Sequence, residues 1–164
     1  MIIGVDNGAC SGAIVALSPL DGSILGYSGL PNHKVGKKTE LDTQALKHWI
    51  KGFEVEPTVI AVEEPLHHAP SSQSMRSMAM CYGQILGMAV GVGWDFASVG
   101  VREWQKEVLG KFPQGQSKKY ATAKAAELAP HERWLDPSKP RARKAHDGII
   151  DAYLIAHYAW EKGK

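Results

Sequence analysis

The sequence predicts an α/β fold in which a mixed five-stranded sheet is flanked by helices. First, three short β-rich segments separated by tight turns open the chain, and such turns require antiparallel neighbours. Second, strands alternate with amphipathic helices further on, a pattern typical of parallel pairing through crossovers. Third, a length of 164 residues, 44% of them hydrophobic and 22% charged, suits one globular domain over residues 1–164.

Five segments have the composition of strands. The first run ends in an acid, the second and third are joined through the turn residues Pro19, Asp21 and Gly22, and the fourth is apolar and β-branched. An apolar run of that kind is expected for a strand buried on both faces. The predicted strands are Met1 to Asp6, Gly12 to Ser18, Ser23 to Leu30, Thr58 to Val62 and Asp95 to Val99.

Five further segments have the periodicity of helices. From the candidate N-cap Asp42, apolar residues recur at helical spacing as far as Phe53. Gly110 and Ser117 are typical signals for the end of one later helix and the N-cap of the next. The other predicted helices are Ser74 to Val92, Arg102 to Leu109, Ser117 to Pro130 and His146 to Glu161. The predicted loops are the basic and mobile segment Pro31 to Glu40 and the proline-containing segment Trp134 to Lys144.

Three glycines in the second predicted helix, Gly83, Gly87 and Gly91, are four residues apart and therefore share one helix face. A face without side chains lets another backbone approach closely. Two partners fit this face: the sheet of the same chain, or a second copy of the chain in a homodimer.

The chain has no sequence features of export or of membrane insertion. Its two cysteines, Cys10 and Cys81, fit neither a disulfide framework nor a metal-binding spacing, and its N-terminus lacks the regions of a signal peptide. The longest apolar stretch, Met78 to Trp94, is shorter than the ~20 residues of a bilayer span. We therefore expect a cytoplasmic, reducing environment and no membrane contact.

Positive charge is concentrated in the last third of the chain. The formal net charge is +2, but residues 1–100 hold 6 basic and 9 acidic side chains, while residues 101–164 hold 13 and 8. Between Arg102 and Lys144 there are 11 basic and 5 acidic residues, with Trp104, Tyr120 and Trp134 among them. This mixture suits a phosphate backbone and stacked bases, and a solvated surface explains it equally well.

Four acidic residues lie where strand and helix ends bring side chains together. Asp6 is the last residue of the first predicted strand, and Glu63 directly follows the fourth. If these two strands pair in parallel, ~4.8 Å apart, both acids lie in one crevice. Asp147 and Asp151 are four residues apart near the start of the last helix and share one face. Either water or a bound cation must hold like charges at that spacing. Clustered hard oxygen ligands favour Mg²⁺ or Mn²⁺ over zinc.

Three segments around these acids resemble the RuvC-like Holliday junction resolvases. GVDNGACSGAIV is similar to the first-strand motif of that family, AVEEP to its strand ending in glutamate, and HDGIIDAYLIAHY to the last-helix motif of its phage and organellar branch. The resemblance spans residues 2 to 158 and implies a ribonuclease H-like fold. It also implies a homodimer that cuts four-way DNA junctions with two divalent cations, Mg²⁺ or Mn²⁺, and leaves 5′ phosphates. The acidic positions that would hold the cations are Asp6, Glu63, Asp147 and Asp151.

The same resemblance suggests roles for further residues. Lys118 matches the lysine that family members carry near the scissile phosphate, with Lys119 as a close rival, and a lysine at a helix start adds to the anion affinity of that helix. His146 either assists the reaction, by moving a proton or contacting the phosphate, or simply begins the last helix. The other expected DNA-binding residues are Lys34, Lys37, Lys38, Leu66, His67, His68, Arg141, Arg143 and Lys144. Of these, Leu66, His67 and His68 would stack on bases in the open crossover. A nucleoid, a phage-infected cell or an organelle matrix fits this activity.

Some features depart from the family, and other functions fit the same acids. Asn7 stands where many bacterial members have proline, and the last two acids are four residues apart where bacterial members commonly have three. Both spacings share a helix face, so the chemistry survives the difference. The rival functions are an RNA:DNA hybrid nuclease and a noncatalytic junction-binding module. An actin-like kinase fold also begins with a similar motif, but it needs two such domains to enclose a nucleotide.

Overall fold

The computed structural model of the protein describes residues 1–8, 11–53, 55–65 and 71–163. Within these ranges one mixed sheet has the strand order β3-β2-β1-β6-β7. The strands are β1 (Ile2–Asp6), β2 (Ala13–Leu17), β3 (Ile24–Gly29), β6 (Val59–Glu63) and β7 (Phe96–Val99). β1, β2 and β3 are antiparallel, whereas β6 pairs in parallel with β1 and β7. This arrangement confirms the predicted mixed five-stranded sheet.

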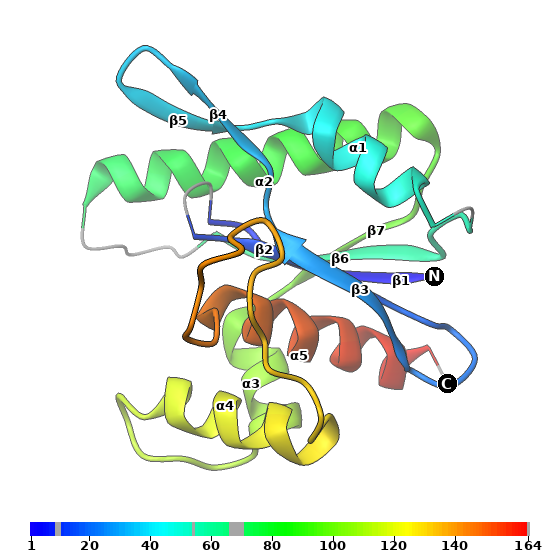
Figure 1. Cartoon of the computed structure of the whole chain (residues 1–164), viewed down its shortest axis with the longest axis vertical. Coiled ribbons are helices and arrows are strands. Elements are labelled where there is room, and N and C mark those ends of the chain that lie inside the picture. The colour runs from blue at the N-terminus through cyan, green and yellow to red at the C-terminus, as the bar shows by residue number, and fades with distance from the viewer. Residues whose placement is uncertain (9–10, 54, 66–70, 164) are drawn as a thin grey trace.

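Helices cover both faces of the sheet, so the protein has three layers (Figure 1). The helices are α1 (Thr43–Lys51), α2 (Ser72–Val92), α3 (Val101–Leu109), α4 (Ser117–Leu128) and α5 (Asp147–Lys162). Figure 1 shows α1 and α2 on one face and α3, α4 and α5 on the other. No helix in the described ranges combines the length and the apolar content that crossing a membrane requires.

The alternation of side chains along the strands separates two hydrophobic cores. Ile3 and Val5 of β1 pack with residues of α1 and α2, whereas Val15 and Leu17 of β2 pack in the cluster that contains α5. Successive residues of a strand point to opposite faces, so one strand supplies both cores. It follows that the even-numbered residues of β1, including its last residue Asp6, face the α5 side.

α5 lies directly on β1 because the contact surface of β1 lacks a side chain. A Cβ atom at Gly4 would collide with the carbonyl oxygen of Ala152 and with the backbone of Ala156. The central part of α5 is buried almost throughout. This close approach sets the height of α5 above the sheet, and with it the position of the residues at the start of α5.

The segment from Pro31 to Glu40 is not the mobile loop that its charge suggested. Asn32–Val35 forms β4 and Lys38–Leu41 forms β5, paired antiparallel with Asn32 opposite Leu41. The hairpin turns at Gly36, whose φ of 61° lies in the left-handed region that glycine adopts readily and most residues with a side chain rarely do. Buried Leu41 attaches the hairpin to the core of α1 and α2. The prediction was wrong because the polar composition hid the turn signal.

The start of α4 also differs from the prediction. Ser117 is the first residue of the helix and not its N-cap. The cap position belongs to Gln116, whose side chain makes no capping bond within the part of the chain that the structure describes. The backbone N–H of Gln116 donates to the carbonyl of Pro113, so the preceding turn leads into the helix one residue early. Asp42, by contrast, is confirmed as the N-cap of α1, since its carboxylate accepts from the N–H of Ala45 at 2.9 Å.

The segment from Trp134 to Lys144 contains neither a helix nor a strand, as predicted, but a buried carboxylate holds it to the sheet. Asp136 is 2% exposed, and its Oδ1 accepts from the N–H of Gly29 at 3.1 Å and from the hydroxyl of Ser138 at 2.7 Å. Lys139 lies 3.3 Å from the other oxygen. Burial raises the pKa of Asp136, but these bonds outweigh burial and leave the pKa below its ordinary value of 3.8.

Replacing Asp136 by Asn should lower the free energy of unfolding by about 2 kcal/mol at pH 7, because buried charge-assisted bonds are lost. The folded-state pKa is depressed, so this contribution is present above the unfolded pKa and disappears as pH falls through the folded one. Urea unfolding at several pH values measures it. Asp21 is the matched control, since it accepts from Ser23 in the same local geometry but is exposed. Equal losses in Asp136→Asn and Asp21→Asn would contradict this assignment.

Candidate active site

Asp6 and Glu63 are the last residues of two neighbouring parallel strands. Val5 of β1 pairs with Val62 of β6, so the next residue on each strand lies beside the other at the C-terminal edge of the sheet. Both carboxylates are on the α5 side: Oδ2 of Asp6 is 2.8 Å from the point where a Cβ on Gly148 would lie, and Oε1 of Glu63 accepts from Trp104 of α3. The two acids therefore share one crevice.

The first turn of α5 closes this crevice. His146 is the N-cap of α5, and its Nδ1 accepts from the N–H of Ile149 at 3.3 Å. A side chain at Gly148 would collide with the carbonyl oxygen of Ser11 and with Asp6, so only glycine lets the helix start so close to β1. As a result Asp147 begins the helix beside the strand ends. His146 thus serves as the N-cap of α5, and its part in moving a proton or contacting the phosphate stays a prediction.

The carboxylates are close enough to perturb one another. Burial, followed by the charges of Glu63 and Asp151, raises the pKa of Asp6 to about 8. Burial, followed by Glu63 and Asp147, raises the pKa of Asp151 to about 7. Burial also raises the pKa of Glu63, partly offset by the bond from Trp104. Such a cluster binds protons near neutral pH unless another positive charge is supplied.

Lys118 of α4 supplies one positive charge at the exposed rim of the cluster. Its Nζ lies 2.8 Å from Oδ2 of Asp147, and both side chains are largely exposed. Its pKa is raised by the hydrogen bond and the charge of Asp147 and, more weakly, by Asp151 and Asp6. The next residue, Lys119, is exposed and, in the described structure, makes no hydrogen bond to these acids. Of the two rival lysines, Lys118 is the one in contact with the carboxylates.

The donor set fits a hard divalent cation. All four side chains offer carboxylate oxygens, which Mg²⁺ and Mn²⁺ prefer, and the raised pKa values of Asp6 and Asp151 mean that a cation would displace bound protons. Within the described parts of the chain, no three acidic, histidine or cysteine side chains already surround one point at ligand distance. A cation would therefore have to draw the carboxylates of Asp6, Glu63, Asp147 and Asp151 together.

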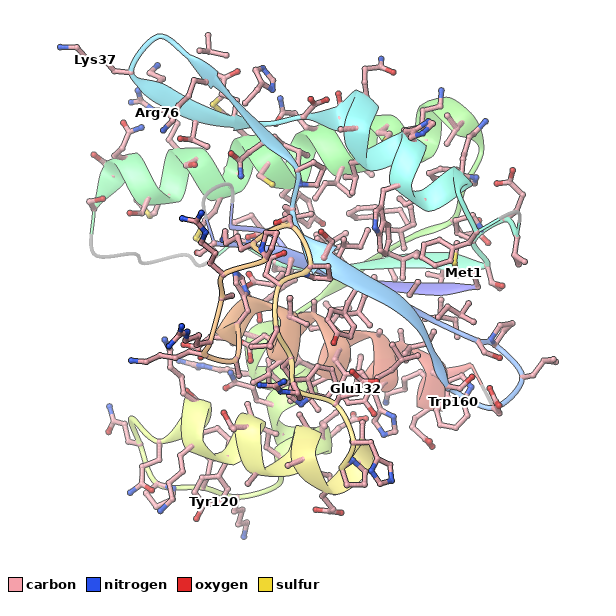
Figure 2. The ribbon with its side chains drawn as sticks, viewed as in Figure 1. Met1, Lys37, Arg76, Tyr120, Glu132 and Trp160 are labelled. Atoms are coloured by element: carbon pink, nitrogen blue, oxygen red, sulfur yellow. The ribbon has the colours of Figure 1, made fainter. Side chains whose placement is uncertain are left out.

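A cavity of about 510 Å³ opens beside Asp6, between the β4–β5 hairpin and α2. Three of its lining side chains are cationic: Lys37 and Lys38 from the hairpin, and Arg76 from α2. Figure 2 shows Lys37 and Arg76 at the same end of the molecule, where the hairpin extends over α2. Arg76 did not appear among the sequence predictions, because one arginine early in a helix carries no signal by itself. The hairpin fold is what brings it beside two lysines.

The remaining predicted DNA-binding residues have varied positions. Lys34 donates to the hydroxyl of Thr39 across the hairpin at 2.7 Å. Arg141, Arg143 and Lys144 are exposed on the segment that Asp136 holds. The residues Leu66, His67 and His68 lie outside the described residues.

Two aromatic residues of the basic stretch are not available for base stacking. Trp104 is 1% exposed and Trp134 is 4% exposed, and both belong to the core beneath α5. The expectation that they stack on nucleic-acid bases is therefore wrong. Both side chains are buried because a tryptophan ring has a large apolar surface, which is stabilised by packing in a hydrophobic core.

The glycine face of α2 points away from the protein. A Cβ atom added at Gly83, Gly87 or Gly91 would find no atom within 4 Å in the described parts of the chain. The alternative in which these glycines pack on the sheet is therefore wrong. Instead the buried residues of α2, Cys81, Ile85 and Ala89, lie on the opposite face.

The comparisons with known proteins identify the fold. The sequence matches no protein-family model and no curated protein. RuvC from T. thermophilus, solved in complex with a Holliday junction substrate, matches with a TM-score of 0.64 and 15% identity over 99% of this chain and 95% of that chain. The chain has the RuvC fold. A second Thermus thermophilus RuvC structure (TM-score 0.59, 13% identity) covers 99% and 97% of the two chains. Fowlpox virus resolvase, solved with substrate Holliday junction DNA, gives 0.59 and 11% over 99% of each chain.

The RuvC-like fold agrees with the resemblance that the three acidic motifs suggested. The ribonuclease H-like sheet, with three antiparallel strands followed by parallel ones, is the one expected. The carboxylates converge where the chain order of this fold brings β1, β6 and α5 together. What the side chains do chemically does not follow from the fold, because sites and not folds carry function.

The metal-free protein should lose stability as pH rises from about 5 to 8. Asp6 and Asp151 have folded-state pKa values of about 8 and about 7, above their ordinary value of 3.8, so the folded state holds extra protons in that window. The unfolded chain has already released these protons, so the folded state loses stability as pH rises through this window, and the loss ends once the protons leave the folded state as well. Thermal unfolding should show a flatter profile for Asp6→Asn and a larger Mg²⁺-induced rise in Tm at pH 8 than at pH 5. Exposed Asp95→Asn should behave as wild type, and an identical slope in Asp6→Asn would refute the assignment.

Proposed function

We propose that the protein is a divalent-metal-dependent endonuclease that resolves four-way DNA junctions. The observation that carries the proposal is the convergence of Asp6, Glu63 and Asp151 in one crevice, with Asp147 at its rim, beside a cavity that Lys37, Lys38 and Arg76 help to line. A protein that only binds DNA gains nothing from clustered negative charge next to phosphates. The fold supports the substrate class, because RuvC and the fowlpox resolvase have been solved with junction DNA.

The acids of the crevice would act as cation ligands. When bound there, two divalent cations would supply an activated water and stabilisation of the leaving 3′ oxygen for an in-line hydrolysis. Glu63 and Asp6 hold the inner side of the site on the rigid strand ends, and Asp147 and Asp151 hold the helix side. Lys118 bonds to Asp147. If Asp147 ligated a cation, Lys118 would be free to stabilise the negative charge that develops on the phosphate.

The cationic surfaces around the crevice would bind the DNA arms. Lys34, Lys37 and Lys38 lie on the hairpin at one side, and Arg141, Arg143 and Lys144 lie on the segment after α4. Lys119 would contact the backbone near Lys118. Phosphate contacts from such residues position a substrate without reading its sequence. The residues Leu66, His67 and His68, which follow Glu63 in the sequence, keep their predicted role of stacking at the crossover.

Incubation with a four-way junction, a matched linear duplex and an RNA:DNA hybrid tests the proposal. With Mg²⁺ or Mn²⁺ the wild-type protein should cut the junction and leave 5′ phosphates, and it should be inactive in EDTA. Asp147→Asn should reduce the cleavage rate about 100-fold or more, because it removes a ligand while the shape of the side chain is kept. The exposed change Glu127→Gln at the far end of α4 is the control and should leave the rate unchanged.

Each alternative function predicts a different result. Cutting confined to the hybrid would replace the junction activity with hybrid hydrolysis. Tight junction binding without cutting in any metal would leave a noncatalytic binding module. Cutting that persists in EDTA would overturn the metal-dependent mechanism.

We also propose that the protein acts as a homodimer through the outward face of α2. Residues 77–94 contain no charged side chain, and Met80, Leu86 and Val90 on this helix are 47%, 37% and 66% exposed. The three glycines lie among them and let a second helix approach closely. A groove of about 350 Å³ between α1 and α2, lined in part by Gly87, Met88 and Gly91, adjoins this face. Two-fold symmetry suits a substrate in which two opposed strands are cut.

Val90→Arg should convert the dimer into a monomer, because a charge buried in an apolar interface is strongly unfavourable. Sedimentation velocity measures the oligomeric state. Leu20→Arg is the control, since Leu20 is 92% exposed on the turn between β2 and β3 and lies outside the proposed interface. The Val90→Arg monomer should nick single strands of a junction without paired cutting. A dimer that persists in Val90→Arg, or a wild-type monomer, would contradict the interface.

A further inference from the structure

Trp104 makes a hydrogen bond that its role in the core does not require. Its indole Nε1–H donates to Oε1 of Glu63 at 2.8 Å, from a side chain that is only 1% exposed. Indole nitrogen is a donor only, so Trp104 cannot itself ligate a cation. The bond uses one carboxylate oxygen of Glu63, Oε1, and leaves the other, Oε2, free to bind a cation.

Glu63 is held at both of its ends. The side chain of Asn7, which is fully buried, donates through Nδ2 to the backbone carbonyl of Glu63 at 2.6 Å. Trp104 holds the carboxylate at the other end. The neighbouring acid, Glu64, has an exposed partner instead, because its carboxylate accepts from the hydroxyl of Ser98 at the surface. Of the two acids that follow Val62, only the one in the crevice is held by a buried donor.

The element that carries Trp104 is itself joined to the helix of the other acids. Glu103, the preceding residue of α3, accepts from the hydroxyl of Tyr158 on α5. α5 begins with Asp147 and carries Asp151 one turn later. α3 therefore connects the two parts of the site. Its Trp104 bonds to Glu63 on the sheet, and its Glu103 bonds to α5, the helix that carries Asp147 and Asp151.

We propose that Trp104 is a positioning residue that orients the Glu63 carboxylate for divalent-cation binding. The inference rests on the proposed metal-dependent function of the same site. A fixed hydrogen bond to a ligand sets its rotamer before the cation arrives, so less ordering is needed on binding. Loss of such a partner typically weakens metal binding about 10- to 100-fold. Because the Glu63 carboxylate remains in place, loss of the Trp104 bond should lower the affinity for the cation and leave the number of bound cations unchanged.

Two other buried tryptophans provide matched controls. Trp134 belongs to the same core cluster, and its indole N–H has no hydrogen-bond partner among the residues that the structure describes. Trp134→Phe therefore removes the same atoms from the same core without changing Glu63. Trp94 donates its indole N–H to Glu56, a residue before β6 at the opposite end of that strand from Glu63. Trp94→Phe removes an indole–carboxylate bond away from the crevice.

The experiment measures Mn²⁺ binding by titration calorimetry and junction cleavage across a range of Mn²⁺ concentrations. Trp104→Phe should weaken Mn²⁺ binding about tenfold, while Trp134→Phe and Trp94→Phe should stay within about twofold of wild type. Cleavage by Trp104→Phe should recover at high Mn²⁺, with the KM for the junction unchanged. Unfolding stability should fall in all three variants, because each leaves a cavity.

A second measurement uses the unaltered chain, in case Trp104→Phe does not fold. In a ¹⁵N–¹H spectrum the indole resonance of Trp104 should shift on addition of Mg²⁺, while that of Trp134 should not. An unshifted Trp104 resonance in a protein that binds Mg²⁺, or equal Mn²⁺ affinity in Trp104→Phe and Trp134→Phe, overturns the positioning role and leaves the nuclease proposal standing. A wild-type protein that binds no divalent cation and cuts no junction overturns both.

Discussion

The repulsion among buried carboxylates at one end of the sheet is the constraint on which the rest of the structure depends. Asp6, Glu63 and Asp151 share a crevice where burial raises all three pKa values and the charges of neighbouring acids raise those of Asp6 and Asp151 further. Such an arrangement opposes folding when the acids are ionised, so the surrounding structure must hold it. The parallel pairing of β1 and β6 sets two of the acids side by side, and the close docking of α5 brings the others.

That docking depends on two missing side chains. Gly4 lets the backbone of α5 rest on β1, and Gly148 lets the first turn of the helix reach the end of the same strand. Between them the helix packs with a nearly continuous buried face, and this burial supplies the apolar free energy that offsets the charge repulsion. The acidic residues at the start of α5 therefore destabilise the fold, whereas the buried apolar residues along the rest of the helix stabilise it.

Around the crevice, the hydrogen-bond donors lie inside the protein and the cationic side chains lie at its surface. Trp104 and Asn7 contact Glu63 from within the protein, whereas Lys118 contacts Asp147 where both are exposed. Further out, Lys37, Lys38 and Arg76 line a cavity that begins at Asp6. An anionic substrate would thus meet exposed positive side chains first and the buried carboxylates last. This order suits a polyanion whose phosphate reaches the acids only with added positive charge.

Much of this could be predicted from local pattern. The five core strands, five helices, the N-cap Asp42 and the four acids are visible in the sequence because hydrophobic periodicity and acids at strand ends are local signals. The β4–β5 hairpin escaped prediction because its charge hid a glycine turn, and Arg76, Trp104 and Asn7 escaped because their partners are distant in the chain. Sequence by itself determined which residue types stand at the ends of which elements. Only tertiary structure decided which of them touch, because contacts between distant segments depend on strand register and on how closely helices pack.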